Sequence, residues 1–250
     1  MRLNADLERR IAERTAELTA ANAELEAFAY AVSHDLRGPL RALSGFSQAL
    51  QEDYGPQLTG EAGLYLQQID IASRNMGRLI DGILVLSRVT RGELQRETID
   101  VSAMAERLLA GLARESPARA VDWRVAPGLI VAGDSHLIET ALSNLLGNAW
   151  KYTGRADAPR IRVDAGSVAG LDGICVADNG AGFDEAYAER LFKPFQRLHR
   201  QDEFPGIGIG LATVQRIVRR HGGEIRAEGR PGAGATFCFA LPAGLAQEAS

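Results

Sequence analysis

The sequence predicts an α+β multidomain protein in which a coiled-coil and helical-hairpin bundle precedes an α/β sandwich. Residues 1 to about 92 carry helical hydrophobic patterns and no strand pattern, whereas helices and short apolar runs alternate after Gly92. A chain of 250 residues has room for two domains. We therefore expect five segments: a coiled-coil helix over 1–21, a helical domain over 22–92, a hinge over 93–99, an α/β domain over 100–245 and a disordered tail over 246–250.

Composition excludes several classes of protein. The 28 basic and 32 acidic residues give a net charge of −4, which argues against a nucleic-acid partner. No apolar run approaches the roughly 20 residues of a membrane span, and the N-terminus lacks a signal-peptide core. We therefore expect a cytoplasmic chain with no membrane segment. Cys175 and Cys238 lie in strand-like runs without a Cys/His cluster, which favours two buried thiols over a disulfide or a metal site.

The first helix carries a heptad pattern. Its seam consists of apolar residues seven apart with companions between them, at Leu7, Ile11, Leu18, Ala21, Leu25, Phe28 and Val32. A period of 3.5 favours a left-handed coiled coil, and the alternative is a helix packed on a neighbouring domain.

A turn separates this helix from a second one. Asp53–Gly60 has turn chemistry. The helical pattern that follows has apolar residues at Leu66, Ile69, Met76, Ile80, Ile83 and Val89. Two long helices with a short connection form a hairpin, and one hairpin has too little core to close by itself. We therefore expect a homodimer held by a four-helix bundle.

The second half alternates helices and strands. Helices are expected over Val101–Leu112, Leu137–Lys151 and Leu211–Val218. Strands are expected over Val121–Val125, Ile161–Val163 and Ile174–Ala177, with a hairpin of Glu224–Ala227 and Ala235–Leu241.

A histidine and a carboxylate are neighbours on the first helix. Because Val32 lies on the seam, His34 points toward solvent, beside Asp35. Pro39 clashes with the carbonyl of Asp35, which predicts a bend that opens this turn. A neutral imidazole can attack an electrophile while a carboxylate holds its other N–H. The alternative is a plain surface pair, and the chemistry needs a phosphoryl donor elsewhere in the chain.

Three motifs of the second half suit a nucleotide. Asn144, Asn148 and Lys151 lie on one helix, where amide oxygens and an ammonium suit hydrated Mg²⁺ and phosphates, although an amide-capped helix end also fits. Asp178–Phe183 follows a strand, so its aspartate could accept from an exocyclic amine, although a calcium loop or simple turn also fits. The glycines of 206–210 open a helix and expose N–H groups to phosphate.

In this order the motifs resemble those of a sensor histidine kinase of two-component signalling, over roughly residues 22–242. Residues 34–39 resemble the acceptor box of its dimerisation and phosphotransfer domain. The second half is similar to the Bergerat-type (GHKL) ATP-binding domain, also found in gyrase, mismatch-repair and chaperone ATPases. The N box of this domain matches residues 144–152, and its first glycine box matches 178–182. The F box matches 191–195, the second glycine box 206–211 and the last glycine box 232–236.

The resemblance implies ATP and Mg²⁺ as cofactors, and roles for particular residues. Asp178 would bind the adenine amine, with Thr236 supporting through water. Asn148 would ligate Mg²⁺ and Lys151 would contact phosphate. Arg197 would face the γ-phosphate from a mobile lid within Phe183–Phe204. The other implied cofactor-binding residues are Asn144, Tyr152, Gly180, Gly182, Phe195, Gly206, Gly208, Gly210 and Leu211.

The resemblance also implies an activity and partners. His34 would be autophosphorylated, with Asp35 polarising its ring, and the phosphoryl group would pass to the receiver domain of a response regulator. An upstream sensor of PAS, GAF or phytochrome type would signal through the coiled coil. Gly38 stands where family members that dephosphorylate their regulator carry Thr or Asn, so it argues against phosphatase activity. Ile207 replaces the commoner Thr, but its backbone N–H is unchanged.

Three alternatives are weighed against this interpretation. A water-directed ATPase clamp would need a glutamate as general base where Asn144 stands. A non-enzymatic dimeric scaffold would keep the fold without binding ATP. A kinase with net phosphatase output would need a polar side chain at Gly38.

Overall fold

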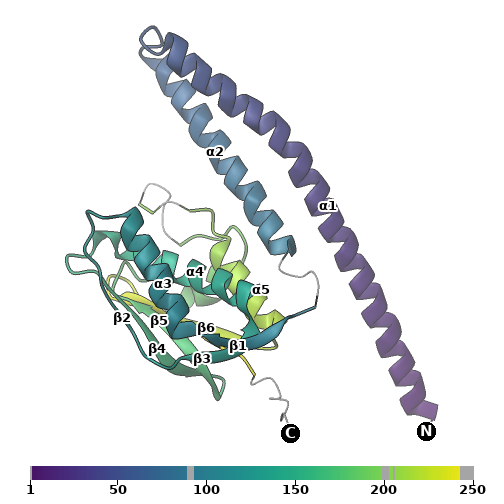
Figure 1. Cartoon of the computed structure of the whole chain (residues 1–250). Coiled ribbons are helices and arrows are strands. Elements are labelled where there is room, and N and C mark those ends of the chain that lie inside the picture. The colour runs from purple at the N-terminus through teal and green to yellow at the C-terminus, as the bar shows by residue number, and fades with distance from the viewer. Residues whose placement is uncertain (1, 89–92, 199–202, 205, 243–250) are drawn as a thin grey trace. The chain divides into compact units, whose positions relative to one another are not determined.

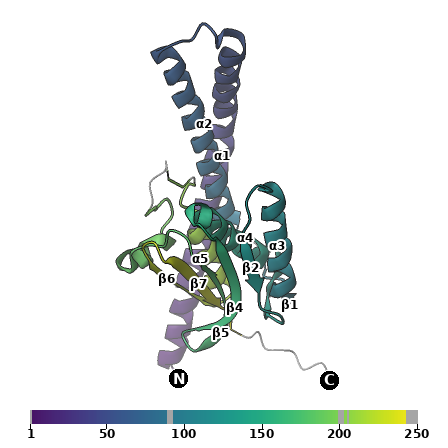
Figure 2. The same cartoon turned by 90° about the vertical axis from the view of Figure 1, so that its left-hand side faces the viewer.

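The structure, a computed structural model, describes residues 2–88, 93–198, 203–204 and 206–242 (Figures 1 and 2). Its contacts divide the chain into two units, Met1–Arg88 and Val89–Ser250, and each unit is described by itself. The predicted tail over 246–250 lies outside the described residues. None of the described helices combines the length and hydrophobicity needed to cross a membrane.

The first unit is the predicted helical hairpin. Helix α1 spans Arg2–Tyr54 and continues as a helix through Pro39, and helix α2 spans Glu61–Arg88. The connection between the two helices falls within the predicted turn. The N-terminal heptad is helical as predicted, but several of its seam side chains lie outside the described set. The coiled coil and the bend at Pro39 therefore stay predictions.

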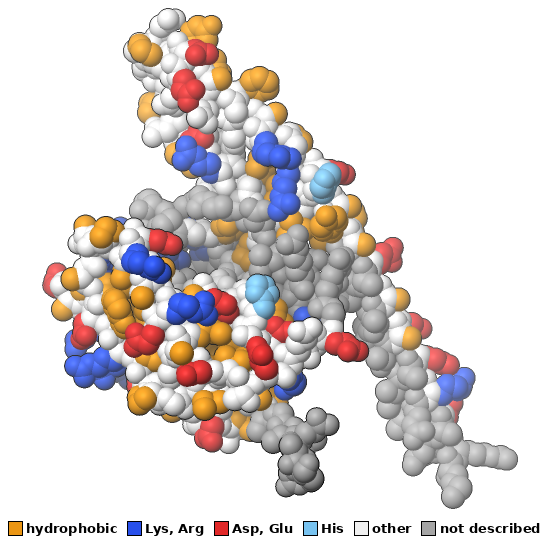
Figure 3. Space-filling view, viewed as in Figure 1, with side chains coloured by type: hydrophobic (Ala, Val, Ile, Leu, Met, Phe, Trp, Pro, Cys, Tyr) orange, Lys and Arg blue, Asp and Glu red, His pale blue; other side chains and the backbone are white. Residues whose placement is uncertain are grey.

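The two helices share a narrow interface. Its buried residues are Ser33, Ser47, Leu66, Ser73, Ile80 and Leu84. Gly77 lets the helices approach closely, because a Cβ there would lie 3.2 Å from Cδ2 of Leu40. Many large apolar side chains of the hairpin remain exposed, and hydrophobic side chains are visible along it in Figure 3. One hairpin alone therefore leaves much of its apolar surface in water.

The second unit is an α/β sandwich, as predicted. Its five-stranded sheet has the order β2-β4-β5-β7-β6, with β2 and β4 parallel and the other neighbours antiparallel. The strands are β2 (Asp122–Val125), β4 (Arg160–Val168), β5 (Leu171–Asp178), β6 (Glu224–Arg230) and β7 (Gly234–Ala240). A separate antiparallel pair consists of β1 (Arg96–Asp100) and β3 (Ile130–Asp134).

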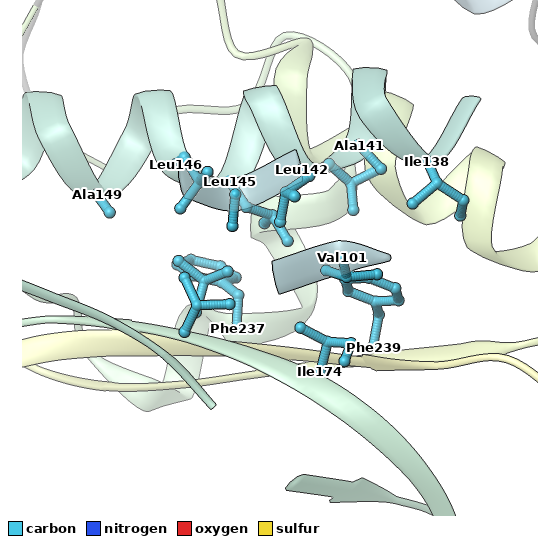
Figure 4. Close-up of a cluster of buried hydrophobic side chains, with 14 of the residues drawn as sticks. Val101, Ile138, Ala141, Leu142, Leu145, Leu146, Ala149, Ile174, Phe237 and Phe239 are labelled. Atoms are coloured by element: carbon cyan, nitrogen blue, oxygen red, sulfur yellow. The ribbon is translucent and has the colours of Figure 1, made fainter. Parts of the chain in front are cut away.

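Three α-helices and two 3₁₀ segments complete this unit. They are α3 (Val101–Glu115), α4 (Ser135–Tyr152), α5 (Gly210–Arg220), η1 (Thr153–Arg155) and η2 (Glu185–Phe192). The core lies between α4 and the sheet, where Leu142 and Leu145 point toward Phe237 and Phe239 (Figure 4). Fully burying one such side chain contributes roughly 1.5–3 kcal/mol, so α4 is held firmly over the sheet.

Two expectations about this unit are wrong. Residues 96–99 were expected in the hinge, but they form most of β1, which pairs with β3. Cys175 and Cys238 were expected as free thiols, but they form a disulfide. The reason is the register, since these residues face each other directly across β5 and β7. Both side chains are half-buried rather than in the core.

Candidate functional site

The predicted phosphoacceptor pair lies on the surface of α1. The side chains of His34 and Asp35 are 73% and 82% exposed, as the sequence predicts for a ring facing solvent. They border a surface hollow together with Arg37, Gly38 and Arg41. Two guanidinium groups beside the imidazole make this surface attractive to anions.

The hydrogen bond between the pair selects a tautomer. Nδ1 of His34 lies 3.3 Å from Oδ1 of Asp35. A carboxylate only accepts, so Nδ1 carries the proton and donates it. Nε2 of the neutral ring is then left with its lone pair, which is the atom that can act as a nucleophile.

In the second unit, α4 carries most of the predicted nucleotide residues. The helix begins at its N-cap Asp134, whose carboxylate accepts from the N–H of Leu137 at 3.1 Å. Its apolar face packs on the sheet, so Asn144, Asn148 and Lys151 are left half-buried at the edge of the core. The amide of Asn144 donates to the carbonyl of Thr140 at 2.8 Å, which orients its oxygen.

The glycine-rich segment before α5 lies directly on these α4 side chains. A Cβ on Gly210 would lie 2.6 Å from Oδ1 of Asn144, and a Cβ on Gly206 would lie 3.3 Å from Nζ of Lys151. Gly208 has a positive φ of 78°, which favours glycine. The two motifs, more than fifty residues apart in the sequence, therefore form one site.

Lys151 is a half-buried cation of this site. Its ammonium lies 4.2 Å from the centre of the Tyr152 ring. Burial, helped by the nearby charge of Arg197, lowers the pKa of Lys151 to about 8. The group is mostly charged at pH 7 and only partly solvated, which suits it to bind phosphate.

Asp178 ends β5 on the core side of the sheet. Its Oδ1 accepts from the N–H of Gly180 at 2.8 Å. Burial raises the pKa of Asp178 to about 6, although the N–H groups of Gly180 and Ala235 act in the opposite direction. At pH 7 the residue is therefore mainly a carboxylate, which can accept from an exocyclic amine.

The loop after Asp178 fits closely against the end of α4. The N–H of Ala181 donates to the carbonyl of Tyr152 at 3.1 Å, and a Cβ on Gly180 would overlap that same carbonyl. Gly182 has a φ of 60°, and a Cβ there would overlap the carbonyl of Arg230. Both predicted glycines are thus required by backbone contacts.

The segment after η2 brings Arg197 to the site. Burial raises the pKa of Tyr152, and the charge of Arg197 acts in the opposite direction. The same charge helps to lower the pKa of Lys151, and a Cβ on Gly208 would lie 3.2 Å from Cγ of Arg197, so these groups are neighbours. Nη2 of Arg197 donates to the carbonyl of Phe204 at 2.6 Å. Phe195 joins the site through its backbone, because its N–H donates to the carbonyl oxygen of Gly208 at 2.9 Å. Its side chain is 47% exposed.

Two further predicted residues are Thr236 and Leu211. Ala235 pairs with Asp178 and faces the core, whereas Thr236 pairs with Ala177 and therefore points to the opposite face of the sheet. Thr236 and Asp178 nevertheless line the same surface hollow, and the support of Thr236 for adenine stays a prediction. Leu211 packs on the hydrophobic core.

The sequence did not single out Arg155 and Phe204 as site residues. The Phe204 ring is only 5% exposed and lies 4.9 Å from that of Tyr152. The guanidinium of Arg155 lies 5.2 Å from the centre of the same ring. A lone aromatic residue in a polar stretch was the available signal, since such a side chain needs a place to be buried.

Comparisons with known families match both units. Residues 24–92 match the His Kinase A (phospho-acceptor) domain, and residues 133–245 match the histidine kinase-, DNA gyrase B- and HSP90-like ATPase family. These ranges include His34 in the first unit and the α4 site in the second.

The chain is also similar to curated proteins. It is 33% identical over 234 residues to the phytochrome-like protein Cph1 of Synechocystis, covering 94% of this chain and 31% of that protein. It is 36% identical over 245 residues to the methanogenesis regulatory histidine kinase FilI of Methanothrix harundinacea, covering 96% of this chain and 27% of that protein. The chain thus spans about a third of the length of these relatives.

Solved structures share the fold. Full-length ShkA in complex with AMPPNP matches with a TM-score of 0.60 and 25% identity, covering 86% of this chain and 46% of that one. The histidine kinase AdeS of Acinetobacter baumannii matches with a TM-score of 0.56 and 21% identity, covering 83% and 96%. The second likeness concerns the fold alone.

Proposed function

The chain belongs to the histidine kinase family, and from this premise we propose that it transfers the γ-phosphoryl group of ATP to His34. The observation that carries the proposal is the convergence of Lys151, Arg197 and the glycine-rich segment, with the charges of Arg197 and Asp178 both acting on the neighbouring Tyr152. That arrangement offers an acceptor for a base amine at one place and positive groups for phosphates at another.

The nucleophile is prepared by its neighbour. Asp35 accepts the Nδ1 proton of His34, so Nε2 attacks the γ-phosphorus while the bond from that phosphorus to the ADP oxygen breaks. The carboxylate stabilises the positive charge that develops on the ring. The proton stays between Nδ1 and Asp35 until the product releases it.

The α4 site supplies charge compensation for this step. Lys151 and Arg197 would contact phosphate oxygens, and the N–H groups at the start of α5 would donate to them. The amide oxygen of Asn148 suits Mg²⁺, which keeps most of its waters and prefers oxygen ligands. When bound, the ion would reduce the negative charge of the phosphates.

Transfer partners are part of the same proposal. The exposed His34 surface, flanked by Arg37 and Arg41, suits the acidic site of a response-regulator receiver domain. Two copies of the hairpin would cover its exposed apolar residues in a four-helix bundle. We also propose that the chain acts in the cytoplasm and that a sensor domain passes its signal to the kinase through the start of α1.

Gly38 sets the direction of the proposed chemistry. It has no side chain to orient a hydrolytic water one turn after His34, so the output would be kinase rather than phosphatase. Incubating phosphorylated regulator with the chain tests this directly. If the regulator lost its phosphoryl group faster in the presence of the chain than alone, the proposed lack of phosphatase activity would be contradicted.

Labelled ATP tests the main proposal. Wild type incubated with Mg²⁺ and γ-labelled ATP should gain label that is labile in acid and stable in base, as a phosphorus–nitrogen bond is. His34→Gln should take up none while binding nucleotide normally. Rapid phosphate release that is unchanged in His34→Gln would instead favour the ATPase clamp, and failure of the wild type to bind ATP would favour the scaffold.

A further inference from the structure

Phe204 is anchored at the end of α4 by contacts on its side chain. Its ring is buried against Tyr152, with ring centres 4.9 Å apart and planes tilted by 59°. The guanidinium of Arg155, in η1, lies 5.2 Å from the centre of the Phe204 ring. Arg155 also pairs with Glu203 at 3.6 Å.

The aromatic ring is the main part of this anchor. The Arg155–Glu203 pair has side chains that are 61% and 39% exposed, and exposed ion pairs contribute little. A buried aromatic ring contributes more, through its apolar area and its contact with a second ring. The position of residues 203–204 on α4 therefore depends chiefly on the Phe204 side chain.

The backbone of the same residue holds Arg197. Nη2 of Arg197 donates to the carbonyl oxygen of Phe204 at 2.6 Å. Arg197 in turn lies close enough to Lys151 for its charge to act on the ammonium. The side chain and the carbonyl of Phe204 thus join the end of α4 to the second cation of the site.

We propose that Phe204 is a positioning residue of the nucleotide site, whose ring, held between Tyr152 and Arg155, keeps the Arg197 guanidinium beside Lys151 where the terminal phosphates bind. The inference rests on the proposed function, because it takes the ligand to be a nucleoside triphosphate. Phe204 acts through Arg197, so it affects the phosphates more than the base, which Asp178 reads from another part of the site.

Binding measurements on the full chain separate these effects. Dissociation constants for a non-hydrolysable ATP analogue, ADP and adenosine would be measured by calorimetry. Phe204→Ala should weaken the triphosphate roughly tenfold and leave adenosine unchanged, because one charge-assisted contact is lost. Phe204→Tyr should restore binding, since it keeps the ring. In autophosphorylation, Phe204→Ala should raise KM for ATP.

Three further variants guard against a folding artefact. Arg155→Gln, at an exposed residue, should change binding in the same direction with a smaller effect. Leu171→Ala removes an apolar side chain at the start of β5, and Arg162→Gln removes an exposed guanidinium from β4; both should bind like the wild type.

The outcomes are distinguishable. Wild-type affinity for the triphosphate in Phe204→Ala would overturn the inference. Equal losses for all three ligands would also overturn it, because the ring would then support the base pocket or the fold. A wild-type chain that binds none of the three would refute the proposed function itself, and this inference with it.

Discussion

Asp178 is a residue at which ligand recognition and stability conflict. Its pKa is raised to about 6 by burial, whereas a carboxyl in the unfolded chain titrates near its ordinary value of 3.8. The contribution of Asp178 to the stability of the folded domain therefore falls as the pH rises from about 4 through about 6. At pH 7 the ionised group costs on the order of 3 kcal/mol. Such a cost is consistent with a group kept for function.

Asp178→Asn should therefore stabilise the protein while impairing nucleotide binding. We expect a gain of roughly 1–2 kcal/mol at pH 7, since the amide is uncharged but still buried. We also expect at least a tenfold loss of affinity for adenosine, because an amide donor would face the amine of the base. Denaturant unfolding and calorimetric binding, both at pH 7, measure the two effects. Lower stability with unchanged binding would contradict this role.

At the scale of the element, the glycines of the first glycine box are packing requirements. A Cβ on Gly180 would overlap the carbonyl of Tyr152 at the end of α4, whereas a Cβ on Gly111 in α3 would meet nothing within 4 Å. Gly180→Ala should cost about 3 kcal/mol through this overlap. Gly111→Ala, the matched control, should stabilise by about 0.5–1 kcal/mol as a helix interior gains alanine. Equal unfolding free energies for the two variants would refute the assignment.

The junction of β3 and α4 contains a buried histidine. His221 has no exposed surface; its Nε2 accepts from the N–H of Asp134 at 3.0 Å, and its Nδ1 lies 2.8 Å from the carbonyl of Ile217. Burial lowers the pKa of His221, and the charges of Arg96 and Arg220 lower it further. The Ile217 carbonyl and Asp134 act in the opposite direction but do not reverse the shift. Only the neutral ring can satisfy both contacts.

The contribution of His221 to stability should therefore be lost in mild acid, which is opposite in sign to the contribution of Asp178. The unfolded chain takes up the His221 proton near pH 6.5, above the folded pKa, so the stabilisation is present above that pH and is lost as the pH falls below it. His221→Gln keeps a donor and an acceptor but does not titrate. The unfolding free energy of the wild type minus that of this variant should therefore decrease as the pH falls from about 7 to about 5. The same slope in both proteins would exclude His221 as the cause.

How far the sequence predicts the fold depends on the element. Helices α1, α2 and α4 are predicted because each repeats its apolar residues over several turns. Strand β1 is missed because its residues, Arg96–Asp100, are mostly polar and its partner is a single strand far along the chain. The cysteine pair is misjudged because register decides it, and a shift of one residue moves a side chain to the other face.

For the whole molecule, the proposed four-helix bundle would give the first unit a partner. Phe46 is 72% exposed on α1, and further apolar residues are exposed on both helices of the hairpin. Phe46→Glu should convert a dimer to a monomer, because a charge would enter the apolar bundle core, and His34 phosphorylation should fall with it. Sedimentation velocity measures the first effect. Lys193→Glu, at an exposed residue of the other unit, should remain dimeric. A monomeric wild type would contradict the bundle.

The central claim is that one histidine receives the phosphoryl group of ATP. The sequence has four histidines, and three of them, His34, His136 and His221, lie in the described parts of the chain. The most direct measurement is tandem mass spectrometry of the full chain after incubation with Mg²⁺ and ATP, under conditions that preserve phosphoramidates. Phosphate is expected on His34 alone. Phosphate on another residue, or ATP hydrolysis without any modified histidine, would contradict it.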